Sequence, residues 1–322
     1  EFDLGQVLET MYELGMTEEP WTDPKNDKQA MESPEAGNWL DGLFEEYDNF
    51  FKRRAWKIKD RDPNQETFRS RNVYKRKTHA VTKDWRCRVR NCIQGFPMIK
   101  GIHYENSYAA TPLAESVRLV LAKSLYMLAK LGKTNWIVAD AFDVTAAFLN
   151  SLLPTKVFIE LPFYFLEYCA ERGIACRPDQ VIEVANSQYG MPESARLWEK
   201  LFVEILTEKG GCELVQCKSD PCIFYKHDKK GNLIALFISY IDDAVIGGTP
   251  AMVKKIKDHV SSRVEIVDIG KMDTHLSIGY ELKWDSQGPY FECSMQDYVN
   301  KMVQRAEEII GEPLKDHPTP GY

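Results

Sequence analysis

The chain has 322 residues, of which 44% are hydrophobic and 28% charged, and its formal net charge is -7 at pH 7. This length can bury a full core in one large domain or two smaller ones. No run approaches the roughly 20 apolar residues of a membrane-spanning helix, and the N-terminus lacks the basic start and apolar core of a signal peptide. We therefore expect no signal peptide and no membrane partner.

The charge is unevenly distributed. Residues 1–48 carry fourteen acids and only two bases, Lys25 and Lys28, whereas residues 52–90 carry fifteen bases against four acids. A local basic belt is what contacts with phosphate groups require, whatever the total charge. The plain alternative is a solvated charged surface. The acidic leader would either shield the belt or form a disordered tail.

The first half of the chain shows two clear patterns. Residues 33–59 contain an amphipathic helix signal. Residues 73–93 are rich in basic and β-branched residues with an interruption between them, which predicts a hairpin. The helix signal comes from Trp39, Leu40, Leu43, Phe44 and Tyr47. Arg86, Arg88 and Arg90 alternate along the second strand of the hairpin, so they would line one face of it.

Further helices follow. Thr111 as cap and Pro112 in the first turn predict a helix that Gly132 ends. The other predicted helices cover about 193–209, the segment after Pro250, and about 296–310. Strands and helices mix without strict βαβ alternation, so the sequence favours an α+β architecture. The eight cysteines match no zinc spacing, so we expect buried free thiols and a reducing compartment.

Two adjacent acids are the most informative feature. Asp242 and Asp243 lie between two apolar, β-prone runs within residues 234–248, which predicts an antiparallel hairpin with the acids at its turn. Carboxylates placed together there favour a divalent cation such as Mg²⁺, which prefers carboxylate oxygens and substrate phosphates. Ordinary turn chemistry is the alternative, since Asp is common in turns.

A third acid strengthens the metal interpretation. The apolar run 136–139 leads into Asp140 and Asp143. These two residues are an odd number of positions apart, so on a strand their side chains face opposite ways. One of them can join the Asp242 and Asp243 pair, and spacing alone does not decide which.

A series of stretches resembles motifs of the copia-type retrotransposon reverse transcriptases. Asp143-Val-Thr-Ala-Ala-Phe-Leu-Asn150 is similar to the family's Asp-Val-Lys-Thr-Ala-Phe-Leu-Asn, and Tyr240-Ile-Asp-Asp243 is similar to its Tyr-Val-Asp-Asp. Between them, Ser187-Gln-Tyr-Gly-Met-Pro-Glu-Ser-Ala-Arg-Leu-Trp198 matches Ser-Leu-Tyr-Gly-Leu-Lys-Gln-Ser-Pro-Arg-Ala-Trp. Shorter matches are Gly95-Phe96, Gly101-Ile-His-Tyr104, Tyr108-Ala-Ala110, Glu115-Ser-Val-Arg118, Lys218-Ser-Asp-Pro-Cys222 and Ile278-Gly-Tyr-Glu-Leu282. Their order and spacing agree with the family from about residue 33 to the end.

The resemblance implies an α+β right-hand polymerase fold, with fingers, palm and partial thumb and an antiparallel palm sheet backed by helices. It implies an acidic N-terminal extension at 1–32 and a reverse transcriptase domain at 33–322. The subdomains would be fingers at about 49–110 and 151–185, palm at about 111–150 and 186–282, and the start of the thumb at about 283–322. The family's RNase H region would follow, so we expect no RNase H activity from this chain.

For the chemistry, the resemblance assigns Asp143, Asp242 and Asp243 as catalytic residues and ligands of two Mg²⁺ ions, with Mn²⁺ as the alternative ion. The backbone carbonyl of Val144 would be a further ligand. Two metal ions held by carboxylates neutralise charge on the attacking and leaving oxygens of an in-line phosphoryl transfer.

The nucleotide pocket is inferred in the same way. Phe148 stands where the family places its sugar gate, which would exclude a 2′-hydroxyl; the alternative is a core phenylalanine. Tyr189 and Gly190 would flank the pocket, although Pro192-Glu193 replaces the family's Lys-Gln there.

Arg86, Arg88 and Arg90 are candidates for the triphosphate, because guanidinium groups bind phosphate oxygens in bidentate fashion. Arg88 fits both registers in which the family's basic strand can be aligned. Template-backbone contact by the whole strand face is the alternative.

Ser277, Ile278, Gly279 and Tyr280 resemble the primer grip. The lysine that the family often carries upstream of this segment is replaced by Val267, and Lys271 or water could supply its proton.

Together these residues predict an RNA-directed DNA polymerase that adds dNTPs to a primer 3′ end on an RNA or DNA template. The resemblance also implies an intracellular place of action, in the cytoplasm, in virus-like particles or in the nucleus, and allows a homo-oligomer. Two alternatives remain: a non-catalytic, retrotransposon-derived nucleic-acid-binding or scaffold subunit, and a related palm polymerase with another template or priming rule. Net acidity and the missing lysine motivate the scaffold; the complete acidic triad argues against it.

Overall fold

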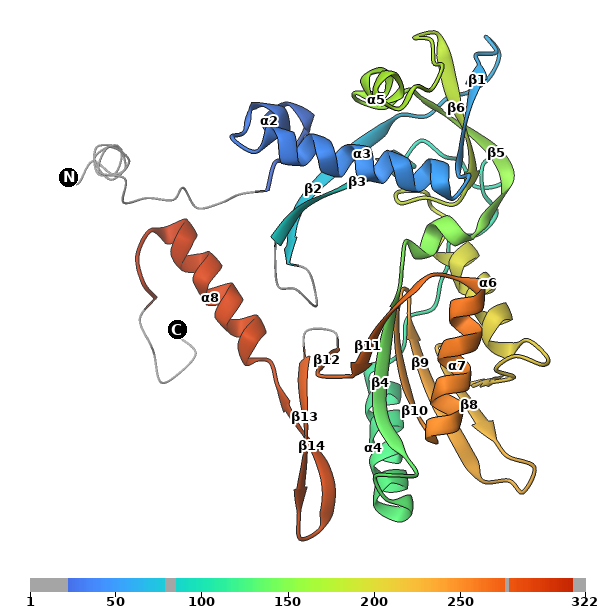
Figure 1. Cartoon of the computed structure of the whole chain (residues 1–322), viewed down its shortest axis with the longest axis vertical. Helices are drawn as coiled ribbons and strands as arrows, with labels where there is room; N and C mark the ends of the chain where they lie inside the picture. Colours follow the sequence, from blue (N-terminus) through green and yellow to red (C-terminus); the bar gives the residue numbers. More distant parts are fainter. Residues whose placement is uncertain (1–22, 79–84, 276–277, 315–322) are drawn as a thin grey trace.

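A computed structural model describes residues 23–78, 85–275 and 278–314. Within these residues the chain forms four sheets, and all pairings between their strands are antiparallel (Figure 1). Helices pack against the sheets without βαβ alternation. The α+β class predicted from the sequence is therefore confirmed at this level.

The upper part of Figure 1 is built around the helix that the sequence predicted. Its elements are α2 (Asp27–Glu32), α3 (Ala36–Lys52), β1 (Trp56–Asp60), β2 (Ser70–Thr78), β3 (Trp85–Ile93), β5 (Leu152–Glu160), α5 (Phe165–Arg172) and β6 (Gln180–Asn186). The α3 helix buries Trp39, Leu43 and Tyr47 in one core with residues of β3, β5 and β6. The predicted hairpin is also present: β2 and β3 pair along their whole length.

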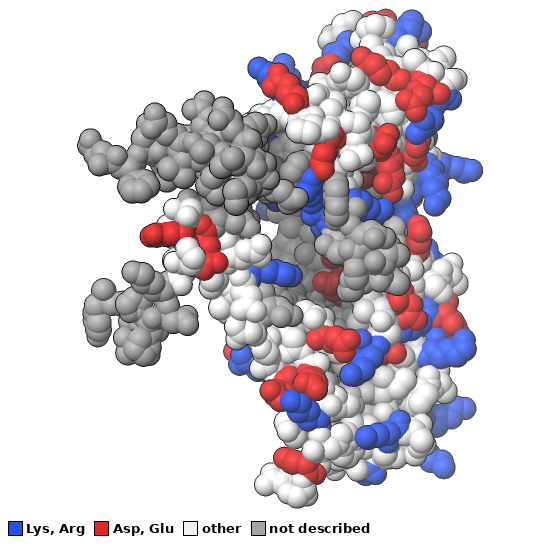
Figure 2. Space-filling model, turned by 60° about the vertical axis from the view of Figure 1, so that its left-hand side comes forward, with Lys and Arg blue, Asp and Glu red and all other residues white. Residues whose placement is uncertain are grey.

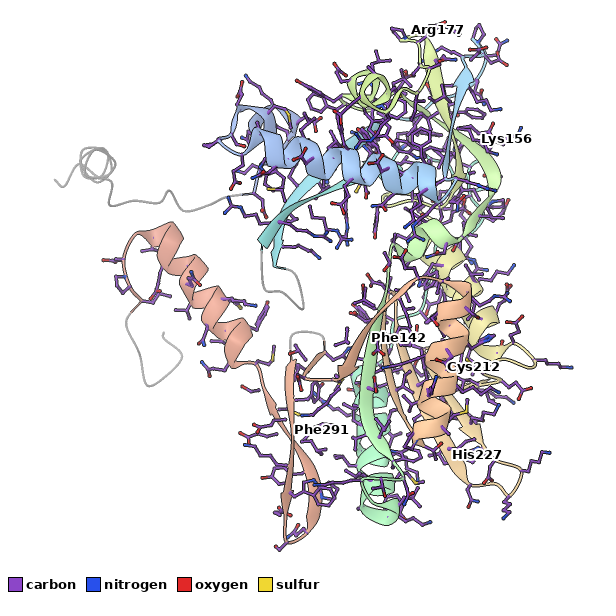
Figure 3. The ribbon with its side chains drawn as sticks, in the orientation of Figure 1. Phe142, Lys156, Arg177, Cys212, His227 and Phe291 are labelled. Atoms are coloured by element: carbon purple, nitrogen blue, oxygen red, sulfur yellow. The ribbon has the colours of Figure 1, made fainter. Side chains whose placement is uncertain are left out.

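The lower part is a six-stranded sheet in the order β11-β4-β10-β9-β8-β7. Its strands are β4 (Ile137–Val144), β7 (Val215–Gln216), β8 (Ile223–His227), β9 (Leu233–Tyr240), β10 (Asp243–Gly248) and β11 (Ile266–Lys271). One face packs against α6 (Ser194–Thr207) and α7 (Pro250–Arg263), and the other against α4 (Ala114–Leu131). Phe142 and Cys212, labelled in Figure 3, belong to the core on the α7 face.

A short 3₁₀ helix, η1 (Ala147–Asn150), connects β4 to β5 and so joins the two parts. Arg53, at the end of α3, strengthens this junction: its guanidinium donates to Asn150 Oδ1 at 3.1 Å and to Glu265 Oε2 at 2.9 Å. The last elements are β12 (Thr274–His275), β13 (Ile278–Asp285), β14 (Gly288–Ser294) and α8 (Gln296–Ile310). The β13–β14 pair lies along α4, and α8 stands apart from the sheets (Figure 1).

The predicted start of the α4 helix is wrong by a few residues. The helix begins at Ala114 with Leu113 as its N-cap, whereas Thr111 was predicted as the cap. The Leu113 N–H donates to Asp220 Oδ2 at 3.0 Å, which keeps this segment extended. The end is as predicted, because Gly132 caps the helix with φ of +86°.

Part of the acidic leader lies in the described residues. Asp23 accepts hydrogen bonds from Lys75 and from the Arg76 N–H, and Asp27 accepts from Tyr74, so this part packs on β2. Residues 1–22 lie outside the described residues. All eight cysteines are unpaired, and four of them are buried: Cys87, Cys169, Cys212 and Cys222. Among the described residues, no helix is both long and apolar enough to cross a membrane.

Candidate metal centre and adjoining cavity

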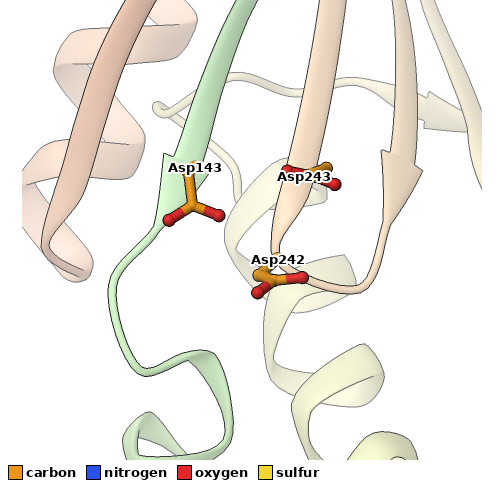
Figure 4. A group of neighbouring side chains, drawn as sticks. All are labelled: Asp143, Asp242 and Asp243. Atoms are coloured by element: carbon orange, nitrogen blue, oxygen red, sulfur yellow. The ribbon is translucent and has the colours of Figure 1, made fainter. Parts of the chain in front are cut away.

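Three carboxylates meet at one end of the six-stranded sheet. Asp143 is near the end of β4, and Asp243 opens β10 directly opposite it in the strand register. Asp242 lies in the two-residue turn between β9 and β10. Ligand atoms of the three side chains lie within 4.8 Å of one another, and each side chain is partly exposed (Figure 4). Acids separated by about a hundred positions in the sequence thus form one cluster.

The turn that carries Asp242 is held in a strained conformation. Ile241 has φ of +55°, a left-handed value that a β-branched residue rarely adopts. Two contacts fix it: Trp198 Nε1 donates to the Ile241 carbonyl at 2.7 Å, and the Val144 N–H donates to the Asp242 carbonyl at 2.9 Å. The second bond also places the Val144 backbone beside the acids. The sequence reasoning did not identify Trp198, although it lies in the quoted motif 187–198.

The structure decides between the two acids of β4. Asp143 faces the Asp242 and Asp243 side chains, whereas Asp140 faces the other side of the sheet, as an odd separation requires. There Asp140 forms an ion pair with Lys257 of α7, and the same lysine also contacts Asp268. Asp140 is therefore neutralised by protein, and Asp143 is the third member of the acidic cluster.

The cluster is electrostatically costly without a cation. Burial, and then the Asp242 and Asp243 charges, raise the pKa of Asp143 from 3.8 to about 6. Burial and Asp242 also raise the pKa of Asp243. Like charges directly opposite each other on neighbouring strands are destabilising. No described lysine or arginine forms an ion pair with any of the three acids.

This donor set fits hard divalent cations. Such ions take carboxylate oxygens, and their charge would relieve the repulsion that raises the pKa of Asp143. The carboxylate oxygens of Asp143, Asp242 and Asp243 together form a group that could hold a metal ion.

A cavity of about 220 Å³ lies next to η1, between α3 and β3. Its walls include Arg86 and Arg88 of β3, Tyr189, and Thr145 and Ala146, which follow Asp143 and Val144 in the chain. Arg88 has no hydrogen bond or ion pair with a described residue, and its charge lowers the pKa of Asp143. Arg86 pairs weakly with Glu45 at 3.5 Å. On the face drawn in Figure 2, Lys and Arg side chains border the hollow between the two parts.

The predicted arginine face is real, and it has a member that the sequence reasoning missed. Cys87 and Val89 point into the core, so Arg86, Arg88 and Arg90 share the opposite face of β3. Lys77 lies directly across the hairpin from Arg86 and therefore on the same face. Burial, then Arg88 and Arg90, lower the pKa of Lys77, while Asp242 and Asp143 oppose this. Alternation along β2 was the signal that could have identified it.

Three predicted pocket residues lie together. Phe148 on η1 packs edge-on against the Tyr189 ring, with centroids 5.2 Å apart, and the Arg90 guanidinium lies 4.7 Å above the same ring. Gly190 has φ of +89°, and a Cβ there would lie 2.0 Å from the Ile93 carbonyl oxygen. Glycine at this position is therefore required by its contact with β3, whatever it does for a ligand.

The segment predicted to hold the primer is only partly described. Ile278, Gly279 and Tyr280 begin β13, and Ser277 lies outside the described residues. Val267 lies directly opposite Asp143 in the β11–β4 register and is 45% exposed. Lys271, the suggested substitute for a lysine at 267, lies opposite Asp140 beyond a register shift and is 3.6 Å from Asp273. Its position does not favour that role.

Comparison with known proteins identifies the class of protein. A family model described as reverse transcriptase (RNA-dependent DNA polymerase) matches residues 53–315. The chain therefore belongs to the reverse transcriptase family. It is also 22% identical over 300 residues to the retrovirus-related Pol polyprotein from transposon TNT 1-94 of Nicotiana tabacum, so the resemblance to the copia type is confirmed. That alignment covers 92% of the chain but 21% of the tobacco protein, so the chain spans about a fifth of this relative's length.

Proposed function

We propose that the chain is an RNA-directed DNA polymerase that extends a primer 3′ end with dNTPs by two-metal-ion phosphoryl transfer. The observation that carries this proposal is the convergence of Asp143, Asp242 and Asp243 beside a cavity lined by Arg88, which has no ion pair with a described residue. The membership of the chain in the reverse transcriptase family supports it. Template, primer and dNTP are the partners that this activity requires.

In this proposal the six-stranded sheet is the palm, the part built on α3 and the β2–β3 hairpin is the fingers, and β14 with α8 begins the thumb. The corresponding ranges are fingers at about 49–110 and 151–185, palm at about 111–150 and 186–282, and thumb from about 283. Ile278, Gly279 and Tyr280, together with Ser277, would hold the primer end. The proposed place of action is intracellular, in the cytoplasm, a virus-like particle or the nucleus.

Each group has a physical task. The three carboxylates, with the Val144 carbonyl, would hold two Mg²⁺ ions, or Mn²⁺ in their place. Bound ions would neutralise the negative charge that develops on the attacking and leaving oxygens. Arg88, Arg86 and Lys77 would bind the triphosphate, and Arg90 would hold the Tyr189 ring. Phe148 would lie under the sugar and collide with a 2′-hydroxyl, so the preferred substrate would be a dNTP.

Primer extension on an RNA template tests this function. We expect Mg²⁺-dependent incorporation by the natural chain, and loss of at least about a thousandfold in rate when Asp242→Asn removes a ligand of the ions. Asp140→Asn is the control, because Asp140 lies on β4 with Asp143 but pairs with Lys257 on the other side of the sheet. Template binding without Mg²⁺-dependent incorporation would instead support the non-catalytic scaffold. Incorporation that ignores the template would support a terminal transferase.

A further inference from the structure

Glu46 is an acid that the proposed chemistry leaves unused. It is on α3, it is partly buried, and it lines the same cavity as Arg88 and Tyr189. Its Oε1 accepts a hydrogen bond from the Asn91 N–H at 3.2 Å. No ion pair with a described residue involves Glu46. The charged side chains that line the cavity with Glu46 are Lys52, Arg86 and Arg88 on the positive side and Glu45 and Glu265 on the negative side. Of these, Arg86 pairs with Glu45 and Glu265 pairs with Arg53, which leaves Arg88 without an ion pair to a described residue.

The Asn91 backbone that holds Glu46 is itself held rigidly. Asn91 Nδ2 donates to Asn72 Oδ1 at 2.8 Å, and Gln188 Nε2 donates to the Asn91 carbonyl at 2.8 Å. Gln188 in turn accepts from Trp56 Nε1 at 2.9 Å. Because these partners are buried and mutually satisfied, the N–H that Glu46 accepts from has a fixed position at the wall of the cavity.

The charges around Glu46 come from β3 and from α3 itself. Arg88 and Arg90 face it from β3 and stabilise its ionised form, whereas Glu45, next to it on α3, opposes ionisation. The other titratable neighbours are Cys92, Tyr47 and Tyr189. Burial outweighs the Asn91 hydrogen bond and the two arginines, and raises the pKa of Glu46 from 4.5 to about 7. Near neutral pH this carboxyl is therefore divided between its two protonation states.

We propose that Glu46 is a positioning residue for the triphosphate: ionised, it is the counter-charge of Arg88 in the empty cavity, and it takes up a proton from solvent when a triphosphate occupies the cavity. This inference rests on the proposed function. Arg88 is the natural link, because its charge is felt both by Glu46 and by Asp143. A triphosphate carries several negative charges, and like charges nearby favour the protonated carboxyl. Protonation of Glu46 would remove the negative charge that competes with phosphate oxygen for Arg88.

The consequence is that triphosphate binding depends on pH. If binding moves the Glu46 midpoint upward by about one unit, affinity should fall by about five- to tenfold as pH rises from 6.5 to 8.5. The ligand's own titration also changes the affinity with pH, but this contribution is common to all variants. The difference between the natural chain and Glu46→Gln isolates the contribution of Glu46.

The experiment is calorimetry of the full chain with inorganic tripolyphosphate in excess Mg²⁺, in two buffers of different ionisation enthalpy. We expect proton uptake and the full pH dependence in the natural chain and in Asp41→Asn, an exposed carboxylate on the same helix. Glu46→Gln should bind tripolyphosphate without the proton uptake, and its affinity should depend on pH only through the titration of the ligand. An unchanged pH profile in Glu46→Gln would overturn the proposal.

Two further outcomes are distinguishable. Absence of tripolyphosphate binding by the natural chain would overturn the proposal, whereas binding without primer extension would overturn only the proposed polymerase function. If Glu46→Gln does not fold, the carboxyl carbon of Glu46 can be titrated by NMR in the natural chain. Its midpoint should rise when tripolyphosphate is added, and an unmoved midpoint would overturn the proposal.

Discussion

Asp140 and Asp143 lie three residues apart on β4, yet only Asp140 has a cation of its own, the ammonium group of Lys257. The Lys257 and Asp140 side chains are 13% and 17% exposed, so this is a largely buried pair. Asp143 instead faces Asp242 and Asp243 and has no ion pair with a described residue. One strand therefore carries one acid that stabilises the fold and one whose charge is left for a ligand.

The two acids should respond oppositely to the same substitution. Asp143→Asn should weaken Mg²⁺ or Mn²⁺ binding by at least about tenfold, because one carboxylate ligand is lost. Asp140→Asn should leave metal binding unchanged but cost about 2 to 4 kcal/mol of unfolding free energy, because Lys257 loses a buried partner. Metal titration by calorimetry and chemical denaturation measure the two effects. If Asp140→Asn weakened metal binding and Asp143→Asn did not, Asp140 rather than Asp143 would be the metal ligand.

The pH dependence of stability provides a second test. The pKa of Asp143 is about 6 in the folded chain, above the value of about 3.9 for an unfolded aspartate. The stabilising contribution of its proton is therefore complete below about pH 4 and is lost as pH rises through 6. In EDTA the natural chain should lose stability relative to Asp143→Asn over this window. Mg²⁺ should reverse the loss at pH 7, because it binds the ionised form.

Thermal denaturation of both chains at several pH values, with EDTA or with Mg²⁺, measures this difference. Asp140→Asn serves as the control, since its acid lies outside the cluster. Parallel pH profiles for the natural chain and Asp143→Asn in EDTA would contradict the expected repulsion among the three carboxylates.

The sequence was sufficient for the elements that depend on local patterns. Helical spacing of Trp39, Leu43 and Tyr47 predicted α3, and the apolar runs around Asp242 and Asp243 predicted the hairpin. Alternation predicted that Arg86, Arg88 and Arg90 share a face. These features depend on side-chain periodicity, which can be read directly from neighbouring positions.

What the sequence left open depends on contacts between distant segments. The choice between Asp140 and Asp143 required the position of Lys257 on α7. The cavity beside η1 required α3 to pack on β3, so Glu46 could not be recognised from its own surroundings. The helix start at Ala114 depended on Asp220, over a hundred residues away.

A substitution at Phe148 can distinguish a role in substrate selection from a role in core packing. If its ring excludes a 2′-hydroxyl, Phe148→Val should raise the ratio of rNTP to dNTP incorporation by about 10- to 100-fold. Loss of the contact with Tyr189 should also lower stability modestly. Steady-state kcat/KM for paired rNTP and dNTP substrates measures the ratio. A destabilised enzyme with unchanged discrimination would identify Phe148 as a core residue.

A substitution at Val267 tests whether a lysine at that position changes the pKa of Asp143 in the acidic cluster. Residues directly opposite on neighbouring strands share a face with Cβ atoms about 5 Å apart, so the side chain at 267 lies beside Asp143. In Val267→Lys the ammonium group should favour the ionised form of Asp143 and lower its pKa. The acid limb of the pH–rate profile for primer extension should then move down by up to about one unit. Val267→Met, of similar length but neutral, is the control. Because Val267 is 45% exposed, both variants should fold, and identical acid limbs in the two variants would show that the new charge does not reach Asp143.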